Sequence, residues 1–496
     1  MGKELLRLQD VSYTYEGEML PVWAHLSCAF HQGEIHAISG PSGCGKSSIL
    51  YLLDGLIPHM YEGTLEGKVF LRDEDITQVP PRMRCGEIGF VMQNPESQFC
   101  TYTVEEELAF GMENLGIDKE EMAARIQSIL HFIGLEGYEE VNLDDLSGGQ
   151  KQKIAIASVL ITKPSVLLLD EPTANLDPAS RKQIFDLILR IAKEEKTTII
   201  LVEHNISEII HHVDHFVALD ASGNIVLDAY RESEEAEAWI RANTYEPEIP
   251  YREPPSEDRQ PLISLSDLKF AYPIPGKRHQ KGRPIIRGLT LDIFPGDFLA
   301  IVGANGVGKT TLMKLLFKVN TPDSGSIQIL GKPVQQWKTR HLYQEMGLVF
   351  QNPEDQFITN SVFDEMMFSL KRTPLSEEEK TQRVTAMLEK FHLLQEKEKS
   401  PFALSQGQKR RLSVASMLLT NQKILFLDEP TYGQDFENRQ ELMKDMQELV
   451  SQGITIVMIT HDLSLVKQYA TRVVEIENGV VKNAMSTQDF FHSRED

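Results

Sequence analysis

A glycine-rich sequence that ends in lysine and hydroxyl residues occurs twice in the chain, and it can bind phosphate. Its glycines let successive backbone N–H groups converge on phosphate oxygens, and the N-terminus of the following helix adds its dipole. The lysine reaches the β- and γ-phosphates of a nucleotide, and the hydroxyl group after it binds Mg²⁺. The predicted contacts are Gly40, Pro41, Ser42, Gly43, Cys44, Gly45, Lys46, Ser47 and Ser48, and then Gly303, Ala304, Asn305, Gly306, Val307, Gly308, Lys309, Thr310 and Thr311.

A second repeated motif places two adjacent carboxylates after an apolar run. Asp170 and Asp428 each end a predicted buried strand, where a carboxylate is expected if it holds a cation, here Mg²⁺. Glu171 and Glu429 follow and are placed to polarise the water that attacks the γ-phosphate. Each Asp-Glu-Pro could also be a strand-end turn with solvated carboxylates, but the phosphate loops favour catalysis.

Glutamine and histidine residues follow further predicted strands in both halves. Gln93 and Gln351 can offer an amide oxygen to Mg²⁺ or to the attacking water. His204 and His461 can hydrogen-bond the γ-phosphate and sense its loss. A single histidine at a strand end is more often structural, but recurrence at matching positions favours a role in catalysis.

The elements that position these residues also repeat, in the same order and at a nearly constant offset, which indicates a duplicated domain. Apolar runs at 35–39 and 298–302 lead into the glycine loops, and runs at 166–169 and 424–427 lead into the acidic pairs. Such runs suit parallel strands that are buried on both faces. Each half is therefore predicted to be an α/β domain with its function at the carboxyl ends of the strands.

A segment rich in Glu, Pro and Arg separates the two copies. We predict a first domain at 1–243, a linker at 244–260 and a second domain at 261–496. A helix near 233–242 would close the first domain. A further irregular stretch, 273–284, is expected to be an exposed hairpin loop with a basic tip.

Composition limits the classes of function. A length of 496 residues suits two domains, and a net charge of −23 opposes non-specific attraction to nucleic acid or to an anionic membrane surface. The longest apolar runs are far shorter than the roughly 20 residues that cross a bilayer. The four cysteines have no CxxC spacing, which favours reduced thiols in the cytoplasm, and we interpret the N-terminus as a mature cytosolic start.

Together these motifs resemble the ABC ATPases, and the repeat extends the resemblance over the second half. The sequence Leu-Ser-Gly-Gly-Gln at 146–150 distinguishes that family from other P-loop enzymes. The resemblance implies an α/β fold with two P-loop NTPase domains in tandem. Each would contain a mainly parallel sheet, an antiparallel β portion and a helical subdomain. It also implies ATP and Mg²⁺ as cofactors.

In that family two domains pack head to tail, and the signature of one closes over ATP held by the other. The resemblance implies that intramolecular pairing brings each signature to the motifs of the opposite half. The implied signature contacts are Ser147, Gly148, Gly149, Gln150, Ser405, Gln406, Gly407 and Gln408. Tyr15 and Tyr272 match the family's aromatic residue that stacks on adenine, although each could be a strand aromatic.

The second copy departs from the family pattern in places. Gln406 replaces the first glycine of the signature, and residues 432–435 lack the leucine of the first copy's Asn-Leu-Asp. The first copy has Glu-His-Asn at 203–205, where the second has Thr-His-Asp. Both catalytic glutamates and both histidines remain, so we predict two competent sites of unequal rate.

The segments QNPESQF at 93–99 and QNPEDQF at 351–357 look like the ATPases of energy-coupling-factor importers. Such importers take up vitamins and transition-metal ions and include cobalt and hydroxymethylpyrimidine (HMP)/thiamine systems. The resemblance implies a transmembrane scaffold protein, a small substrate-capture membrane protein and a peripheral location at the cytoplasmic face of the cell membrane. Apolar walls of a groove for the scaffold would come from Phe99, Val104, Leu108, Phe357, Val362 and Phe363, about half of which could instead be domain core.

Two alternatives remain at this stage. A tandem ABC protein that acts on ribosomes or nucleic acid would have a long charged, often basic, arm between its domains, whereas this linker is short, acidic and broken by prolines. Tandem sugar-importer ATPases usually degrade one site, whereas both sites are intact here. The transported molecule is not identified by the sequence, because the ATPase does not contact it.

Overall fold

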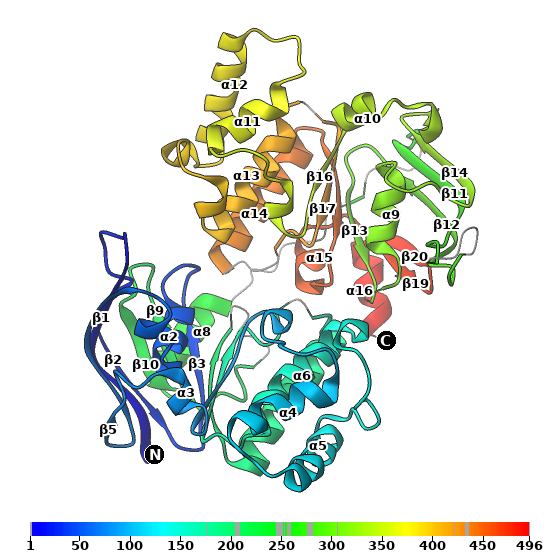
Figure 1. The fold of residues 1–496 in the computed structure, drawn as a ribbon. Coiled ribbons are helices and arrows are strands. Elements are labelled where there is room, and N and C mark those ends of the chain that lie inside the picture. The colour runs from blue at the N-terminus through cyan, green and yellow to red at the C-terminus, as the bar shows by residue number, and fades with distance from the viewer. Residues whose placement is uncertain are drawn as a thin grey trace. The chain divides into compact units, whose positions relative to one another are not determined.

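The computed structural model divides the chain into two compact units, Met1–Glu246 and Pro247–Asp496. It describes residues 2–174, 176–203, 209–244, 251, 253–254, 259–274, 281–304, 306–420, 422–431 and 436–495. Each unit combines two sheets with a set of helices (Figure 1).

The first unit has a small antiparallel sheet and a larger, mainly parallel one. The antiparallel sheet has the order β2-β1-β4-β5, and the second sheet has the order β10-β9-β3-β8-β7-β6. Within the second sheet only β10 runs antiparallel to its neighbour. The strands are β1 (Glu4–Tyr15), β2 (Trp23–His31), β3 (Ile35–Ser39), β4 (Gly63–Leu71), β5 (Glu74–Asp75), β6 (Ile88–Val91), β7 (Val166–Asp170), β8 (Thr198–Val202), β9 (His215–Leu219) and β10 (Ile225–Tyr230).

Both faces of the parallel strands are covered, as their continuous apolar runs predict. One face packs with the antiparallel sheet and α1, and the other with α4 to α7. Alternate residues of β7 show this. Leu168 packs in the core with the antiparallel sheet and α1, whereas Leu167 and Leu169 pack in the core with α4 to α7. The helices are α1 (Lys46–Asp54), α2 (Leu56–His59), α3 (Pro81–Arg84), α4 (Val104–Asn114), α5 (Lys119–Ile133), α6 (Gly148–Leu160), α7 (Pro178–Arg190) and α8 (Glu234–Thr244).

The second unit repeats this architecture. Its antiparallel sheet has the order β12-β11-β14-β15, and its mainly parallel sheet has the order β16-β17-β18-β13-β19-β20. The strands are β11 (Ile263–Phe270), β12 (Ile286–Ile293), β13 (Phe298–Val302), β14 (Ser324–Ile329), β15 (Lys332–Pro333), β16 (Met346–Val349), β17 (Ile424–Asp428), β18 (Thr455–Ile459), β19 (Arg472–Glu477) and β20 (Val480–Ser486). The helices are α9 (Lys309–Leu316), α10 (Thr339–Glu345), α11 (Val362–Leu370), α12 (Glu377–Lys390), α13 (Gln406–Leu418), α14 (Phe436–Ser451), α15 (Leu463–Tyr469) and α16 (Thr487–Glu495).

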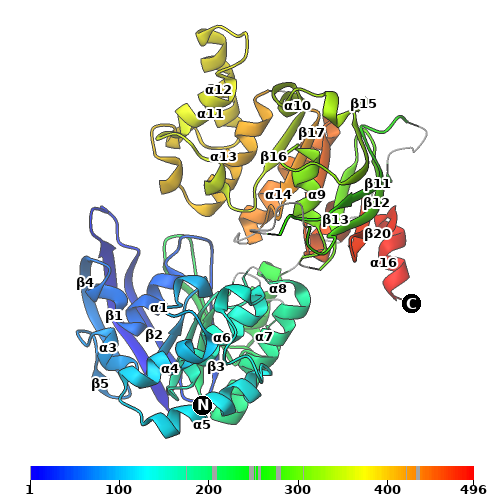
Figure 2. The same ribbon diagram turned by 45° about the vertical axis from the view of Figure 1, so that its right-hand side comes forward.

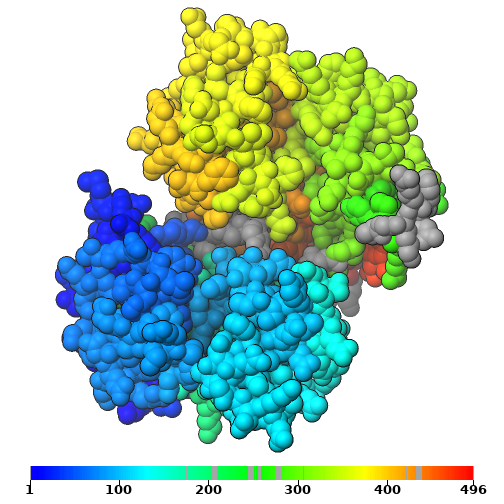
Figure 3. Space-filling view, in the orientation of Figure 1, coloured from blue at the N-terminus to red at the C-terminus, as the bar shows by residue number. Residues whose placement is uncertain are grey.

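In each unit a helical region stands beside the β portion. Helices α4, α5 and α6 contact one another, and α11 contacts both α12 and α13 (Figure 2). On the surface of the first unit, residues near 100–150 (cyan) form a lobe next to the blue β portion (Figure 3). Capping boxes fix the start of α4 at Thr103 and of α12 at Ser376.

The predicted α/β fold with antiparallel and helical parts in each half is therefore confirmed. Helix α8 lies where the sequence predicts a closing helix, but the domain boundaries of 243 and 261 stay predictions. The predicted hairpin loop shows one isolated bridge between Pro273 and Lys281, and its tip at 275–280 lies outside the described residues. None of the described helices is long and apolar enough to cross a membrane.

Candidate active sites

The phosphate loop of the first unit joins β3 to α1 through glycines in left-handed backbone conformations. Gly43 and Gly45 have φ of 81° and 95°. A Cβ atom on Gly45 would lie 2.5 Å from Nε1 of Trp23, so both the conformation and the space require glycine here. Lys46 begins α1, and its Nζ donates to the carbonyl oxygens of Gly40 at 2.9 Å and Pro41 at 2.7 Å. The ammonium group is thus already held over the loop that would receive phosphate.

The second unit builds the same loop between β13 and α9. Lys309 Nζ donates to the carbonyl oxygens of Gly303 at 2.6 Å and Ala304 at 3.0 Å. Of the predicted contacts, Asn305 lies outside the described residues. The recurrence of the lysine geometry supports one phosphate site in each unit.

A hydroxyl group and a carboxylate meet at the strand ends of the first unit. Ser47 Oγ donates to Oδ1 of Asp170 at 3.0 Å, although the two residues are 123 positions apart. Oxygen donors of these two kinds suit Mg²⁺, so the residues present fit the predicted metal. In the second unit Thr310 is exposed at the start of α9. Burial raises the pKa of Asp428 to about 6; the Glu429 charge adds to this increase, and the positive charges of Lys309 and Arg410 oppose it.

The two predicted catalytic glutamates have the same unusual backbone conformation. Glu171 has φ of 47° and Glu429 has φ of 46°, both in the left-handed region. Non-glycine residues held in that region cost about 1–3 kcal/mol and cluster at functional sites. Each N–H donates to the last residue of the neighbouring strand, Val202 in one unit and Ile459 in the other, at 2.9 Å. The sheet edge therefore fixes where both carboxylates project.

The partners of the two glutamates differ between the units. Gln93 Nε2 donates to Oε2 of Glu171 at 2.7 Å. In the second unit, Nδ1 of His461 lies 3.0 Å from Oε1 of Glu429, whereas the side chain of Gln351 is exposed. His204, the first unit's predicted histidine, lies outside the described residues. Each described partner comes from a strand end, as predicted.

The predicted adenine-stacking tyrosines lie next to the phosphate loops. The hydroxyl of Tyr15 is 2.8 Å from Oγ of Ser48, and that of Tyr272 is 3.4 Å from Oγ1 of Thr311. Burial raises the pKa of Tyr15, so its hydroxyl stays protonated at neutral pH. Their position near the loops is compatible with contact to a base, and the stacking role remains a prediction.

The signature sequences form the N-termini of α6 and α13. Ser147 and Ser405 are the N-cap residues, and each forms a capping box with the glutamine three residues later. A Cβ atom on Gly407 would lie 2.4 Å from Oδ1 of Asn438, so this glycine permits close helix packing. A Cβ on Gly148 would meet only a leucine at 3.7 Å, which explains why Gln406 can replace the equivalent glycine.

The QNPxxQF segments connect Gln93 and Gln351, the predicted Mg²⁺ ligands, to the signature helix in the same way in both units. Asn94 and Asn352 cap a short 3₁₀ turn. The next glutamine bonds the signature helix, since Gln98 Nε2 donates to the Ala155 carbonyl at 3.3 Å and Gln356 Nε2 to the Ser413 carbonyl at 3.0 Å. In each segment the glutamate also pairs with a lysine of that helix: Glu96 with Lys151, and Glu354 with Lys409.

Two further residues at these sites escaped sequence reasoning. Glu203 directly follows β8, is buried, and accepts hydrogen bonds from the N–H and hydroxyl of Thr173 at 3.2 and 2.8 Å. Arg410 is buried in α13 and donates to the carbonyl of Gln351 at 2.6 Å, and its charge acts on Asp428. A charged residue that directly follows a five-residue apolar strand was the available signal for Glu203. Arg410 has no comparable local signal.

The predicted groove walls need correction. Val104 and Leu108 of α4, Val362 of α11, and Phe357, which follows a 3₁₀ turn, are buried in the cores of their units and cannot line a groove. Phe99 and Phe363 are half-buried. The large apolar side chains exposed in the same regions are instead Tyr102, Phe110, Leu115, Ile358, Phe368 and Phe402.

Comparison with known proteins finds relatives that match both units. The ABC transporter family matches residues 23–174 and 286–432. YkoD of Bacillus subtilis strain 168, a proposed HMP/thiamine import ATP-binding protein, is 36% identical over 96% of this chain and 90% of its own length. A proposed ABC transporter ATP-binding protein of Methanosarcina acetivorans is 34% identical over 99% of this chain and 87% of its own length.

Among solved structures, CbiO1 from Clostridium perfringens, described as part of the ABC transporter complex CbiONQ, is 31% identical. It covers 48% of this chain and 93% of its own length, with a TM-score of 0.44. The family match spans both phosphate loops and both Asp-Glu pairs. The chain therefore belongs to the ABC transporter family and is a tandem ATPase of that family.

Proposed function

We propose that this chain is the ATP-hydrolysing subunit of an importer of the energy-coupling-factor type. The observation that carries the proposal is the QNPxxQF segment, which links the predicted Mg²⁺-binding glutamine to the signature helix by equivalent contacts in both units. A movement of Gln93 or Gln351 on hydrolysis would be transmitted through this segment to α6 or α13. The full-length similarity to a proposed HMP/thiamine import ATPase supports the import direction.

In the proposed reaction, Lys46 and Lys309 bind the phosphates from their positions over the loops. Asp170 with Ser47 and Gln93, and Asp428 with Thr310 and Gln351, would hold Mg²⁺, which neutralises charge on the phosphates when bound. Glu171 and Glu429 orient the attacking water and accept its proton, and His204 and His461 contact the γ-phosphate. The signature of each unit would complete the site of the other within one chain.

The proposed partners are a transmembrane scaffold protein and a small substrate-capture membrane protein, which would hold the chain at the cytoplasmic face of the cell membrane. Phe110 of α4 and Phe368 of α11 occupy equivalent positions and are 43% and 44% exposed. Exposed aromatic side chains in matching places of two units are suited to binding two apolar helices of one scaffold. Nucleic acid is not a proposed partner, because the net charge is −23.

The first experiment is to purify the chain from its own cells in mild detergent and to identify bound proteins by mass spectrometry. A polytopic membrane protein and a small membrane protein are expected, and the latter would indicate the substrate class. The double variant Phe110→Asp, Phe368→Asp should lose both while ATP turnover remains. Val226→Asp, which alters another exposed apolar residue in β10, is the matched control. Ribosomal proteins, or no membrane partner, would overturn the proposal.

A further inference from the structure

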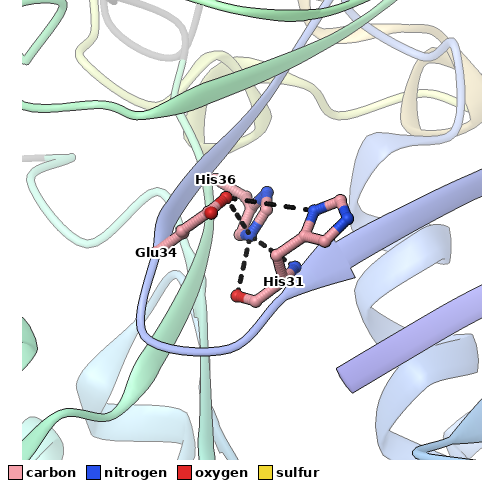
Figure 4. A group of neighbouring side chains, drawn as sticks. All are labelled: His31, Glu34 and His36. Carbon is pink, nitrogen blue, oxygen red and sulfur yellow. Dashed lines mark hydrogen bonds and ion pairs between the residues drawn. The ribbon is translucent and has the colours of Figure 1, made fainter. Parts of the chain in front are cut away.

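Two histidines and a glutamate converge at the turn between β2 and β3, apart from the motifs described above. His31 ends β2, Glu34 lies in the turn, and His36 is the second residue of β3. Glu34 points toward both imidazoles (Figure 4). Its Oε2 lies 3.9 Å from Nδ1 of His31 and 3.9 Å from Nε2 of His36. One ligand atom from each of the three residues lies within 4.8 Å of the other two.

The cluster is buried and its polar atoms are incompletely satisfied. The His36 side chain is fully buried, and the side chains of Glu34 and His31 retain only 16% and 21% of their exposure. Oε1 of Glu34 accepts the Gly2 N–H at 3.0 Å, whereas Oε2 has no hydrogen-bond partner among the described residues. A buried polar atom left unsatisfied costs about 1–3 kcal/mol. A cation between the three side chains would satisfy the carboxylate.

The second unit fills the equivalent place with a permanent positive charge. Asp297 corresponds to Glu34, because each precedes the strand that enters a phosphate loop. Nη1 of Arg472 lies 3.0 Å from Oδ2 of the fully buried Asp297. In that unit, therefore, an ion pair neutralises the buried carboxylate.

The first unit has no such arginine. The strand register pairs Leu299 with Arg472 in the second unit and His36 with His215 in the first, so His215 stands where the arginine would be. Within the described residues, the only basic groups found within 4 Å of Glu34 are the imidazoles of His31 and His36. The buried carboxylate thus lacks the permanent countercharge of its repeat.

The surrounding charges are negative. Oδ2 of Asp214 accepts the Ile35 N–H at 2.8 Å, and Oδ1 of Asp228 lies 3.2 Å from Nε2 of His215. Burial raises the pKa of Tyr230, and the charges of Glu34, Asp214 and Asp228 add to this increase. Three carboxylates therefore act on one small region, which favours the binding of a cation.

We propose that His31, Glu34 and His36 form a binding site for a divalent transition-metal ion of the Zn²⁺ type. Two imidazole nitrogens and one carboxylate oxygen are a common ligand set for such ions, with a fourth position left for water. Tetrahedral bonds of about 2.1 Å place ligand atoms about 3.4 Å apart, so the 3.9 Å distances must shorten by about 0.5 Å. Nε2 of His36 now accepts a hydrogen bond from the His31 N–H at 2.9 Å, and it would lose this bond when it binds the metal.

A bound ion would join the end of β2 to the start of β3, whose other end enters the phosphate loop at Gly40. It would take the structural place of the Asp297–Arg472 pair. The site is separate from the proposed ATP sites and does not depend on the importer assignment.

The test measures Zn²⁺ binding to the full-length, metal-stripped chain without nucleotide or Mg²⁺, by equilibrium dialysis and elemental analysis. One Zn²⁺ per chain is expected. His31→Phe, which introduces the second unit's Phe294, and Glu34→Gln should each weaken binding by roughly 100-fold or more, since even outer partners of metal ligands contribute about 10–100-fold. His131→Ala removes an exposed histidine paired with Glu136 and should bind Zn²⁺ normally.

Circular dichroism and ATP turnover of His31→Phe and Glu34→Gln should match the parent chain, which separates lost binding from lost folding. Because His31 is partly exposed, His31→Phe should disturb folding less than Glu34→Gln. With Co²⁺ as the probe, the parent chain should show the visible absorption of a tetrahedral site and His31→Phe should not. Absence of Zn²⁺ binding would overturn the proposal. Binding that persists in both variants, for example at the exposed Cys85 and Cys100, would also overturn it.

Discussion

Replacement of Glu203 by glutamine is expected to remove a decrease in the free energy of unfolding of the first unit that occurs as pH rises. Burial raises the pKa of Glu203 to about 8; hydrogen bonds from Thr173 oppose this increase, and the charge of Glu171 adds to it. The folded chain therefore keeps a proton that the unfolded chain releases near pH 4.3. Because the folded state binds more protons between these values, the free energy of unfolding falls as pH rises from about 4.3 to about 8.

The size of this decrease in the free energy of unfolding follows from the one proton by which the folded and unfolded states differ. Such a difference changes the free energy of unfolding by at most about 1.4 kcal/mol per pH unit. Between pH 6 and pH 8 the loss is therefore about 2 kcal/mol, and above pH 8 it levels off because both states are ionised. Glu203→Gln keeps an amide oxygen for both hydrogen bonds from Thr173 but carries no charge. Its stability should lack this decrease.

Urea unfolding followed by tryptophan fluorescence can measure the difference. The chain has three tryptophans, of which Trp23 and Trp239 lie in the first unit, so a Trp337→Phe background reports that unit alone. Glu87→Gln is the matched control, because hydrogen bonds from Ser165 and Arg72 lower the pKa of Glu87 and keep it ionised from pH 6 to 8. If Glu203→Gln changed the free energy of unfolding equally at pH 6 and pH 8, the reasoning would be refuted.

Three further predictions concern the sites themselves. Glu171→Gln and Glu429→Gln should each lower ATP turnover at the altered site by roughly 10²–10⁴-fold, and equal residual turnover in the two single variants would contradict unequal sites. Arg410→Gln should raise the pKa of Asp428 further and weaken Mg²⁺-dependent ATP binding below about pH 7; an unchanged pH dependence of binding would argue against this role. Gly407→Ala should lower the free energy of unfolding of the second unit by about 1–3 kcal/mol, because its Cβ would lie 2.4 Å from a side-chain oxygen of α14, and an unchanged urea midpoint would exclude the clash.

The sequence predicted correctly the short buried strands and the positions of residues that directly follow them. Strands β3 and β13 begin and end at the predicted residues, because continuous burial on both faces leaves a run with no polar position. Lys46 and Asp170 lie at the carboxyl edge of one sheet, as their positions after strands predict. Duplication strengthened each inference, because a motif seen twice in order is seldom accidental.

Sequence reasoning failed for the groove because an apolar residue on a helix can face either a core or a partner. Val104 and Leu108 are fully buried, whereas Phe110 in the same helix is 43% exposed. Leu108 lies four positions after Val104 and shares its buried face, whereas Phe110 lies only two positions further along and faces outward. The rotation of the helix on the sheet, which is set by tertiary packing, decides which side chains are buried. No local pattern in the sequence specifies that rotation.

Contacts between distant residues were also inaccessible. Glu203 bonds Thr173, 30 positions away, and Arg410 bonds the carbonyl of Gln351, 59 positions away. The sequence shows that these residues are charged, but their burial and partners depend on how separate strands and helices meet. The same holds for His31 and His36, whose shared carboxylate is identified only by the turn geometry.

The two units place different groups at two equivalent buried positions. The second unit places guanidinium groups at Arg410 and Arg472, which stay charged at any physiological pH. The first unit has Gln152 and His215 at these positions and buries Glu203, whose pKa is near 8. Both units can therefore respond to protons, the first through Glu203 and the second through Asp428, whose pKa is about 6. By our proposal, the first can also respond to a metal ion. If the two ATP sites differ in rate, the inequality should change with pH, because the group that titrates beside the predicted catalytic glutamate differs. In the first site it is Glu203, with a pKa of about 8, and in the second it is Asp428, with a pKa of about 6.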